Sequence, residues 1–401
     1  MAASSARRAV RLGYLVSHPV QYQAPLLRRL AQQTEVDFKV YFLSGMSTGQ
    51  YFDTGFGRPI EWDVPLLDGY KHEFLSPSGE NVEPSRLRNL AVEKVLARDR
   101  VEVLWQHGWG YFTNLRALWH ARRLGIKTLM RGESNLLPRG TNRLKQNAKD
   151  AFLRWCFSRV DAFLCIGRLN REFYRHYGVA DTRLFDVPYA VDNEFFHQRL
   201  AAARENRDSF RTSLGLDARR PVILFAGKLV AHKAPGDLLE AYKRLSHDGA
   251  SEPEAYLVYV GDGVERQALE ELARQTGWNS IRFIGFRNQT ELPAFFDLCD
   301  VFVMPSRWEP WGLVVNEVMN AAKPIVISDG VGCAPDLVRN GVNGMVFPAG
   351  NVAALADSLR KIISSDELRK QMGRNSGEMI SHWSFREDLA GILNAVERVM
   401  S

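Results

Sequence analysis

The sequence predicts an α/β protein with two doubly wound domains, each built on a parallel sheet that helices cover. The chain has 401 residues, which is too long for one ordinary hydrophobic core and suits two domains of roughly 200 residues each. Short β-branched apolar runs alternate with amphipathic segments along the chain, as in βα units around parallel sheets. No internal repeat of fixed period is evident.

The composition is typical of a globular enzyme and excludes a disordered or fibrous chain. Hydrophobic residues make up 45% and charged residues 24%, and the formal net charge is +6. This mildly basic balance suits anionic ligands or a lipid surface. Without a zinc-finger spacing or an RNA-binding aromatic signature, nucleic acid is not expected as a partner.

The four cysteines and the hydropathy of the chain predict a cytoplasmic location. The cysteines show no CxxC spacing, so we expect reduced thiols and no structural metal. No run of roughly 18 apolar residues is present, and Arg11 interrupts the apolar stretch near the N-terminus, so neither a transmembrane helix nor a signal peptide is expected. Any membrane contact would then be peripheral, at the inner face of the membrane.

The first domain is predicted to span residues 1–195. Its expected strands are apolar and β-branched, and they are Val10–Val16, Val36–Leu43, Val101–Trp105, Lys127–Met130, Ala162–Ile166 and Arg183–Val187. Between them, residues 114–124 predict a covering helix that ends at Gly125. Its apolar face is expected to hold Leu115, Leu118, Trp119 and Leu124.

The second domain is predicted to span residues 196–380, with a final helix over 381–401 that packs back toward the first domain. Its expected strands are near-continuous apolar runs, as in strands buried on both faces. They are Val222–Ala226, Tyr256–Val260, Ile281–Ile284, Val301–Met304 and Ile325–Ile327. The charged stretch 193–220 contains no strand candidate, so we place the boundary near 195–215 and expect the chain to bend there.

Residues 300–332 predict a ligand site, because they read as strand, loop, helix, strand and glycine-rich loop. Ligands of open parallel sheets bind at the carboxyl ends of the strands. Pro310 suits a helix entry, and after Trp311 the amides of Gly312, Leu313 and Val314 are expected to face an anion. Leu313 and Val314 are also expected on the buried face of this helix.

Two carboxylates flank that loop. Ionised Glu309 and Glu317 would accept hydrogen bonds from the hydroxyls of a sugar and a ribose. The alternative is a first-turn carboxylate favoured by the helix dipole and a solvated helix residue.

Basic residues follow the strand Val222–Ala226 directly. Gly227, Lys228 and Lys233 are expected at the same sheet edge, where the two cations suit a diphosphate. The alternative is that both are solvated loop lysines. After the next strand, Gly261, Asp262 and Gly263 predict a tight turn that borders the donor or serves as a plain structural turn.

The second half of the chain resembles a known enzyme family. Glu309 and Glu317 are separated by seven residues in PSRWEPWGLVVNE, which resembles the E-x7-E motif of family 4 retaining glycosyltransferases. Other segments match the family's landmarks in order: FAGKLVAHKAPGDLLEAY (225–242), YVGDG (259–263), FIGF (283–286) and NGVNGMVFP (340–348). PYAVD (188–192) resembles the family's PNGVD hinge motif.

This resemblance implies the GT-B fold, in which two Rossmann-like domains face a central cleft. It further implies a hexosyltransferase that moves a sugar from a nucleotide-sugar donor to a saccharide or lipid-linked acceptor, with retention, in polysaccharide or glycoconjugate biosynthesis. Lys228, where the family usually has Arg, and Lys233 would hold the leaving diphosphate. No metal and no cofactor are expected.

The first domain is expected to supply the acceptor side. His18 and Gln21 follow the first strand, His107 follows the strand at 101–105, and Arg131 and Glu133 follow the strand at 127–130. The resemblance implies a site histidine at the last position, which this chain lacks, so His107 and Arg131 are both candidates for contact with the transferred sugar. The alternatives are a structural histidine and an Arg131–Glu133 pair.

A basic amphipathic helix is predicted over 142–159. Its cations suit an anionic membrane that carries lipid-linked acceptors, and a solvated face is the alternative. Three other functions stay open for the chain: a nucleotide-sugar epimerase, a sugar phosphorylase of the same architecture, and a non-catalytic nucleotide-sugar-binding protein.

Overall fold

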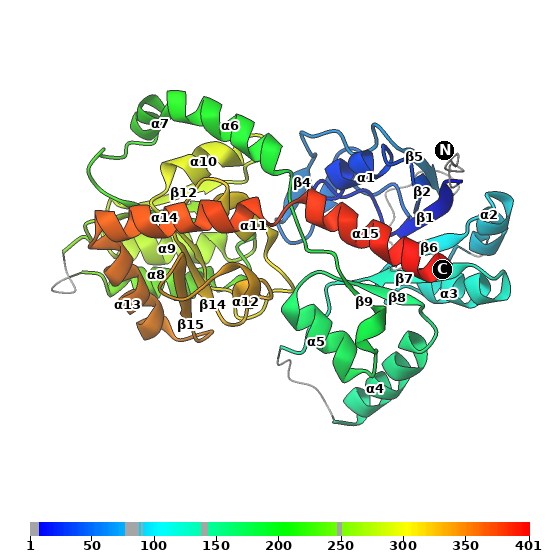
Figure 1. The fold of residues 1–401 in the computed structure, drawn as a ribbon. Helices are drawn as coiled ribbons and strands as arrows, with labels where there is room; N and C mark the ends of the chain where they lie inside the picture. Colours follow the sequence, from blue (N-terminus) through cyan, green and yellow to red (C-terminus); the bar gives the residue numbers. More distant parts are fainter. Residues whose placement is uncertain (1–7, 77–87, 90, 138–142, 247–250) are drawn as a thin grey trace, which may run out of the picture. The chain divides into compact units, whose positions relative to one another are not determined.

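A computed structural model describes residues 8–76, 88–89, 91–137, 143–246 and 251–401. The chain forms two compact units, each of which is described by itself (Figure 1). Unit 1 comprises Met1–Tyr51, Val64–Tyr189 and Phe385–Ser401, and unit 2 comprises Phe52–Asp63 and Ala190–Ser384. The last helix therefore belongs with the first half of the chain. Residues 52–63 belong with the second half, and the sequence did not predict this assignment.

Unit 1 is built on a seven-stranded parallel sheet with the order β5-β2-β1-β6-β7-β8-β9. Its strands are β1 (Val10–Val16), β2 (Val36–Phe42), β5 (Lys71–Phe74), β6 (Val103–His107), β7 (Lys127–Arg131), β8 (Ala162–Cys165) and β9 (Leu184–Asp186). Its helices are α1 (Ala24–Leu30), α2 (Val92–Arg98), α3 (Phe112–Arg123), α4 (Arg143–Phe157), α5 (Arg168–His176) and α15 (Phe385–Met400). The strand order reverses between β1 and β6, which is where such sheets bind ligands.

The predicted covering helix α3 is present, but fewer of its large apolar side chains are buried than expected. Leu118 is buried, whereas Trp119 and Leu124 are 55% and 48% exposed. Ala117 and Ala121 occupy the sheet side instead, because small residues let the helix approach closely. Gly125 ends the helix with a φ of 71°, as the sequence predicted.

The C-terminal helix α15 packs on β7, β8 and β9 of unit 1 (Figure 1). A Cβ at Gly391 would lie 2.0 Å from the carbonyl oxygen of Asp186, so a side chain there would prevent this close approach. Ile392 and Val396 are buried on the same helix. The final 17 residues of the chain thus complete the core of unit 1.

Unit 2 is built on a six-stranded parallel sheet with the order β12-β11-β10-β13-β14-β15. Its strands are β10 (Val222–Ala226), β11 (Tyr256–Val260), β12 (Ile281–Gly285), β13 (Val301–Met304), β14 (Ile325–Ser328) and β15 (Gly344–Phe347), and residues 52–63 add the hairpin of β3 (Tyr51–Asp53) and β4 (Arg58–Ile60). Its helices are α6 (Asn193–Glu205), α7 (Arg207–Ser213), α8 (Pro235–Lys243), α9 (Arg266–Gln275), α10 (Leu292–Leu298), α11 (Leu313–Met319), α12 (Ala334–Leu337), α13 (Val352–Ile363) and α14 (Asp366–Ser381). Here the order reverses between β10 and β13.

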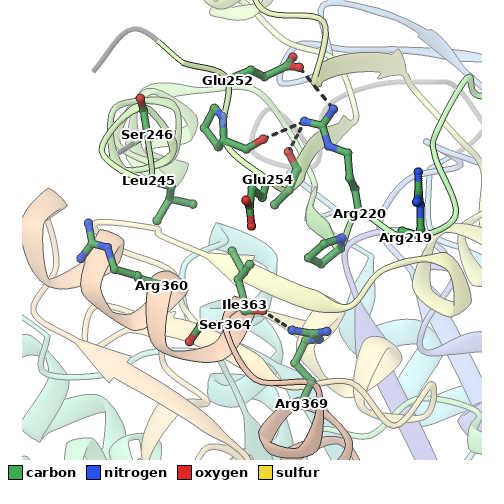
Figure 2. A pocket seen from close by; sticks show the side chains of 13 residues that line it. Arg219, Arg220, Leu245, Ser246, Glu252, Glu254, Arg360, Ile363, Ser364 and Arg369 are labelled. Atoms are coloured by element: carbon green, nitrogen blue, oxygen red, sulfur yellow. Dashed lines mark hydrogen bonds and ion pairs between the residues drawn. The ribbon is translucent and has the colours of Figure 1, made fainter. Parts of the chain in front are cut away.

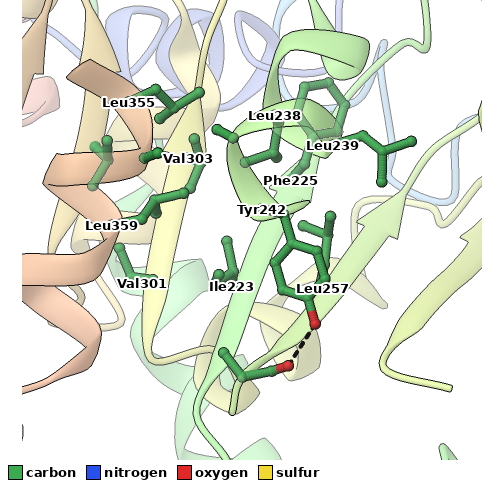
Figure 3. Packing of buried hydrophobic residues seen from close by; sticks show 14 of the residues in the cluster. Ile223, Phe225, Leu238, Leu239, Tyr242, Leu257, Val301, Val303, Leu355 and Leu359 are labelled. Carbon is green, nitrogen blue, oxygen red and sulfur yellow. Dashed lines mark hydrogen bonds between the residues drawn. The ribbon is translucent and has the colours of Figure 1, made fainter. Parts of the chain in front are cut away.

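The core of unit 2 lies between this sheet and the helices α8 and α13 (Figure 3). Ile223, Leu257 and Val301 are fully buried on neighbouring strands, and Leu239 and Leu359 meet them from the helices. The central strands are buried throughout, as predicted. The strand β12 is half-buried because it forms the edge of the sheet.

The stretch 193–220, for which no strand was expected, forms the helices α6 and α7. Asp192 caps α6 by accepting a hydrogen bond from the amide of Phe195. Among the described residues, none of the helices is long and apolar enough to cross a membrane, and all four cysteines are free and buried, as expected for reduced thiols.

Candidate functional site

The strand order of unit 2 reverses between β10 and β13. This switch point brings the predicted Lys233 and Glu309 together. Lys233 follows β10 in a short 3-10 turn, and Glu309 follows β13. The Nζ atom of Lys233 lies 2.5 Å from Oε2 of Glu309, and the two side chains are 17% and 16% exposed. This pair forms at the carboxyl edge of the sheet, where a ligand of a doubly wound fold binds.

The backbone of Glu309 is fixed by the glycine-rich loop that follows β14. Its amide donates to the carbonyl of Gly330 at 3.0 Å, and its carbonyl accepts from the amide of Gly332 at 3.0 Å. A Cβ at Gly332 would lie 1.9 Å from the carbonyl oxygen of Pro310. Glycine is therefore required for the two loops to touch, and the position of the Glu309 carboxylate depends on that contact.

Glu317 lies on α11 and is only 8% exposed. Burial raises its pKa to about 7, although a hydrogen bond at 3.2 Å from Nε2 of Gln289 favours the ionised form. The sequence reasoning missed Gln289, which follows β12 directly after the FIGF segment that it did recognise. The site therefore contains one ion-paired carboxylate and one whose charge changes near neutral pH.

Trp311, which the sequence placed at the donor-binding loop, has its side chain buried. It is 3% exposed, donates from Nε1 to Oδ1 of Asn316 at 3.0 Å and stacks on Trp383 with ring centroids 5.8 Å apart. Gly312 adopts a φ of 96°, and a Cβ there would lie 3.0 Å from the sulfur of Met304. Packing therefore explains why tryptophan and glycine occupy these two positions, and the predicted role of this loop would fall to its backbone.

The helix α11 also turns a different face inward than predicted. Leu313 and Val314 are only partly buried, and Val315 is fully buried in their place. Val318 and Met319 are buried as expected. The helix begins at Leu313 with Gly312 as its N-cap, so Pro310 precedes the helix instead of opening it.

The glycines after β10 and β11 serve a close backbone contact. Gly261 has a φ of 137°, and a Cβ there would lie 1.9 Å from the carbonyl oxygen of Gly227. A Cβ at Gly263 would lie 2.4 Å from the carbonyl oxygen of Leu229. These contacts support the structural-turn alternative for Gly261 and Gly263, because two loops at this edge pack through bare backbone.

Asp262 and Lys228 each form ion pairs with charged side chains. Asp262 accepts from the Nη1 atom of Arg266 at 3.1 Å, and Arg58 approaches it to 3.8 Å. Lys228 donates to both carboxylate oxygens of Asp53, at 2.8 and 3.0 Å. The interpretation of Lys228 as a free loop cation is therefore wrong.

The switch point of unit 1 holds a pocket of about 460 Å³. It is lined by the segments that follow β1, β6 and β7, which are residues 16–18, 20, 22–23, 107–111 and 132–134. His18, His107 and Glu133 lie in it, as predicted from their positions after the strands. The aromatic residues Trp109 and Tyr111, which were not singled out from the sequence, share the lining.

The two histidines of this pocket are neutral at physiological pH. Burial lowers the pKa of His18 to about 4 and that of His107 to about 3. Nδ1 of His107 lies 3.0 Å from the hydroxyl of Tyr14, and that hydroxyl donates to Gln23 at 3.0 Å. Gln23 rather than the predicted Gln21 lines the pocket, and α1 begins directly after it, at Ala24.

Glu133 is held by two tyrosines. Its Oε1 atom accepts from the hydroxyl of Tyr189 at 2.5 Å and from that of Tyr22 at 3.3 Å. Tyr189 belongs to the PYAVD segment, where it departs from the resembled motif. The departure therefore has a structural role, since this hydroxyl positions the acidic side chain of the pocket.

Arg131 is not a ligand-contacting residue, contrary to the prediction. Its side chain is 2% exposed, and Nη2 lies 3.1 Å from Oδ2 of Asp388 on α15. The same nitrogen donates to the carbonyl of Val187 at 3.1 Å, and the guanidinium faces the Tyr189 ring at 4.7 Å. The alternative of an Arg131–Glu133 pair is also wrong. Arg131 instead joins the C-terminal helix to the sheet.

A larger cavity in unit 2 lies at the other end of the strands from the switch point of that unit (Figure 2). It has a volume of about 790 Å³ and opens beside Pro221 and Ala255, which precede β10 and β11. Its arginines are engaged, since Arg220 donates to Glu252 and to the carbonyl of Pro253. Because it borders the amino ends of the strands, the topology does not favour it as the ligand site.

Comparison with known proteins identifies unit 2. Residues 206–379 match the family model described as glycosyl transferases group 1. The second unit contains a glycosyl transferases group 1 domain. This group 1 domain includes Lys228, Lys233, Glu309 and Glu317, so a resemblance to glycosyl transferases is confirmed for this half of the chain at the level of group 1.

Relatives and solved structures extend the likeness to the whole chain. An α-D-kanosaminyltransferase of Streptomyces kanamyceticus is 26% identical over 266 residues, which cover 65% of this chain and 67% of that one. The next three curated relatives are matched over less than half of their own length.

A structure of HepE of Anabaena with UDP shares 17% identity with a TM-score of 0.71, covering 97% of this chain and 100% of that one. A glycosyltransferase from Rickettsia africae shares 12% with a TM-score of 0.72, covering 98% and 100%. The predicted GT-B fold is thus confirmed, and the activity and substrates of the whole chain are matters for proposal.

Proposed function

We propose that the protein is a retaining glycosyltransferase that uses a nucleotide-sugar donor bound at the switch point of the group 1 domain. One observation carries the proposal: the Lys233–Glu309 pair and the buried Glu317 gather where β10 and β13 diverge. Lysine ammoniums suit a diphosphate and carboxylates suit hydroxyls. The solved HepE complex, which holds UDP and shares the fold, supports a nucleotide as the ligand.

The proposed reaction is a front-face displacement. The bond between the sugar's anomeric carbon and the diphosphate oxygen breaks, and the acceptor hydroxyl oxygen bonds to that carbon on the same face. The hydroxyl proton passes to the departing diphosphate. Lys228 and Lys233 would stabilise the negative charge that develops on the leaving group, which is the largest single task of such a site. We propose that these lysines make a metal ion unnecessary.

The carboxylates would orient the donor. Glu309 has its charge and direction set by Lys233 at 2.5 Å, and we assign it to the hydroxyls of the transferred sugar. Glu317, with its amide partner Gln289, is assigned to the ribose. An ionised carboxylate accepts two hydroxyl donors, so a vicinal diol fits each position.

We assign the acceptor to the pocket of unit 1. Its lining includes the neutral His18 and His107 and the carboxyl of Glu133, and Trp109 and Tyr111 add flat aromatic surface. Such a lining suits a saccharide that is uncharged or carries an amine. A role in cell-surface glycan synthesis on the cytoplasmic side of a membrane, with a lipid-linked saccharide, is compatible with the exposed Lys149 and Arg154 of α4.

The test is donor binding followed by transfer. UDP-, GDP- and ADP-sugars would be titrated into the purified protein and into Glu309→Ala and Lys233→Ala, and diphosphate release would be measured with pooled saccharide acceptors. The proposal expects one donor to bind, both variants to weaken it, and release to require acceptor. Donor turnover without acceptor would indicate an epimerase, and binding with no turnover would indicate a non-catalytic binding protein. Binding of no donor would contradict the assignment of this edge.

A further inference from the structure

A hairpin from the first half of the sequence lies on the carboxyl edge of the unit 2 sheet, where we place the donor; we call this the donor edge. This hairpin, residues 52–63, belongs to unit 2 and touches the segments that follow three strands. Asp53 pairs with Lys228 after β10 and Arg58 approaches Asp262 after β11. The contact after β12 is made by the ring of Phe56, whose centroid lies 4.9 Å from that of Phe286 in an edge-to-face arrangement.

The far end of the hairpin is anchored by hydrogen bonds. Nδ2 of Asn288 donates to the carbonyl of Glu61 at 2.6 Å. The amide of Thr290 donates to Oδ2 of Asp63 at 3.1 Å, and the Thr290 hydroxyl donates to the same oxygen. The hairpin is thus attached to the β12 loop at one end and to Lys228 at the other.

The hairpin encloses the Lys228 side chain. Nζ lies 2.8 and 3.0 Å from the two oxygens of Asp53 and 4.9 Å from the centre of the Phe56 ring. A Cβ at Gly55 would lie 2.6 Å from Cδ of Lys228, so the bare backbone of Gly55 packs directly against the lysine stem. Carboxylate, ring and backbone therefore converge on one ammonium.

The Asp53 carboxylate is oriented before it meets the lysine. Its Oδ1 atom accepts from the amides of Gly55 and Phe56 at 2.8 and 3.0 Å. The amide of Gly57 donates to the Asp53 carbonyl at 2.8 Å. This turn fixes the anion at the place where its charge meets Lys228, which is how a side chain is preorganised as a partner.

We propose that Asp53 is a specificity-determining residue that competes with the donor diphosphate for Lys228. The inference rests on the proposed function only in taking Lys228 as a diphosphate-binding group. A diphosphate carries more negative charge than one carboxylate, and the Lys228 side chain is 35% exposed, so a ligand can reach the ammonium and compete with Asp53 for it. Because Asp53 competes for Lys228, a ligand must carry enough negative charge to displace it. Asp53 pairs with Lys228 again when the nucleoside diphosphate product leaves.

Asp53→Asn tests this competition, because an amide oxygen still accepts from Gly55 and Phe56 while the charge is lost. The matched control is Glu61→Gln, which removes the same charge from an exposed position of the same hairpin. UDP, GDP and ADP would be titrated calorimetrically at low salt, with inorganic diphosphate as a base-free probe. We expect Asp53→Asn to bind the preferred nucleotide about two- to five-fold more tightly and Glu61→Gln to match the wild type.

The double variant Asp53→Asn/Lys228→Ala completes a thermodynamic cycle. Because Asp53 acts through the ammonium, its substitution should change nothing when Lys228 is already alanine. Weaker or unchanged binding by Asp53→Asn would overturn the proposal, and so would failure of every variant to bind inorganic diphosphate. Tighter diphosphate binding without any glycosyl transfer would instead overturn only the proposed function.

Discussion

Replacing Arg131 with methionine should unfold unit 1 at a lower temperature without a specific loss of turnover. The substitution leaves Asp388, which is 1% exposed, without its cationic partner. Breaking a buried ion pair in this way costs about 3–5 kcal/mol. For a unit of roughly 200 residues each kcal/mol shifts the midpoint by about 2–4 °C, so we expect a fall of about 6–20 °C by differential scanning calorimetry at pH 7.5.

The pH dependence and a second variant make this prediction strict. Burial raises the pKa of Asp388 to about 6 even beside Arg131, so its charged form is the costly one. In Arg131→Met the stability loss should therefore shrink as pH falls and protonates Asp388, and grow as pH rises. The double variant Arg131→Met/Asp388→Leu should recover most of the midpoint. An unchanged midpoint with a reduced kcat would refute this reasoning and restore Arg131 to the catalytic site.

Three further predictions concern the group 1 domain. Because burial raises the pKa of Glu317 to about 7 and the ionised form is the better hydroxyl acceptor, donor affinity measured calorimetrically should rise from about pH 6 to pH 8, and Glu317→Gln should remove that rise. Lys233→Met should lower kcat by about 100-fold. The unfolding midpoint should change little, since its partner Glu309 is already in contact with solvent. A large drop in the midpoint would show a structural role instead. In Gly261→Ala the added Cβ would lie 1.9 Å from the carbonyl oxygen of Gly227, so both the midpoint and donor affinity should fall, and an unchanged protein would show that the loops separate freely.

The strands and most of the donor edge could be predicted because they follow local patterns. Buried parallel strands are continuous apolar runs, and β10, β11 and β13 begin and end at the predicted residues. Lys228 and Lys233 were proposed because they lie in the segment after β10, and Glu309 because it lies in the loop after β13. The strand β15 was missed, since Gly344–Phe347 is short and only its ends are buried.

Contacts between residues distant in sequence could not be predicted. Nothing near Arg131 signals that its partner is Asp388, which lies 257 positions later. Asp53 and Lys228 are likewise 175 positions apart, and a charged hairpin in the first half reads as surface loop. The burial of the Trp311 ring could not be predicted for the same reason, because Trp383, on which it stacks, is distant in sequence.

The charge balance at the donor edge leads to a last prediction, that transfer does not require a divalent cation. Lys228 pairs with Asp53 and Lys233 pairs with Glu309, so these four groups are together neutral. A donor diphosphate adds negative charge, which either a metal ion or the withdrawal of one carboxylate can offset. The Lys228 side chain is 35% exposed and the Lys233 side chain 17%, so the ion pair of Lys228 with Asp53 is the one that a diphosphate can open. Turnover should therefore persist in excess EDTA. Loss of turnover that Mg²⁺ or Mn²⁺ restores would show that a cation, and not the release of Lys228, balances the charge.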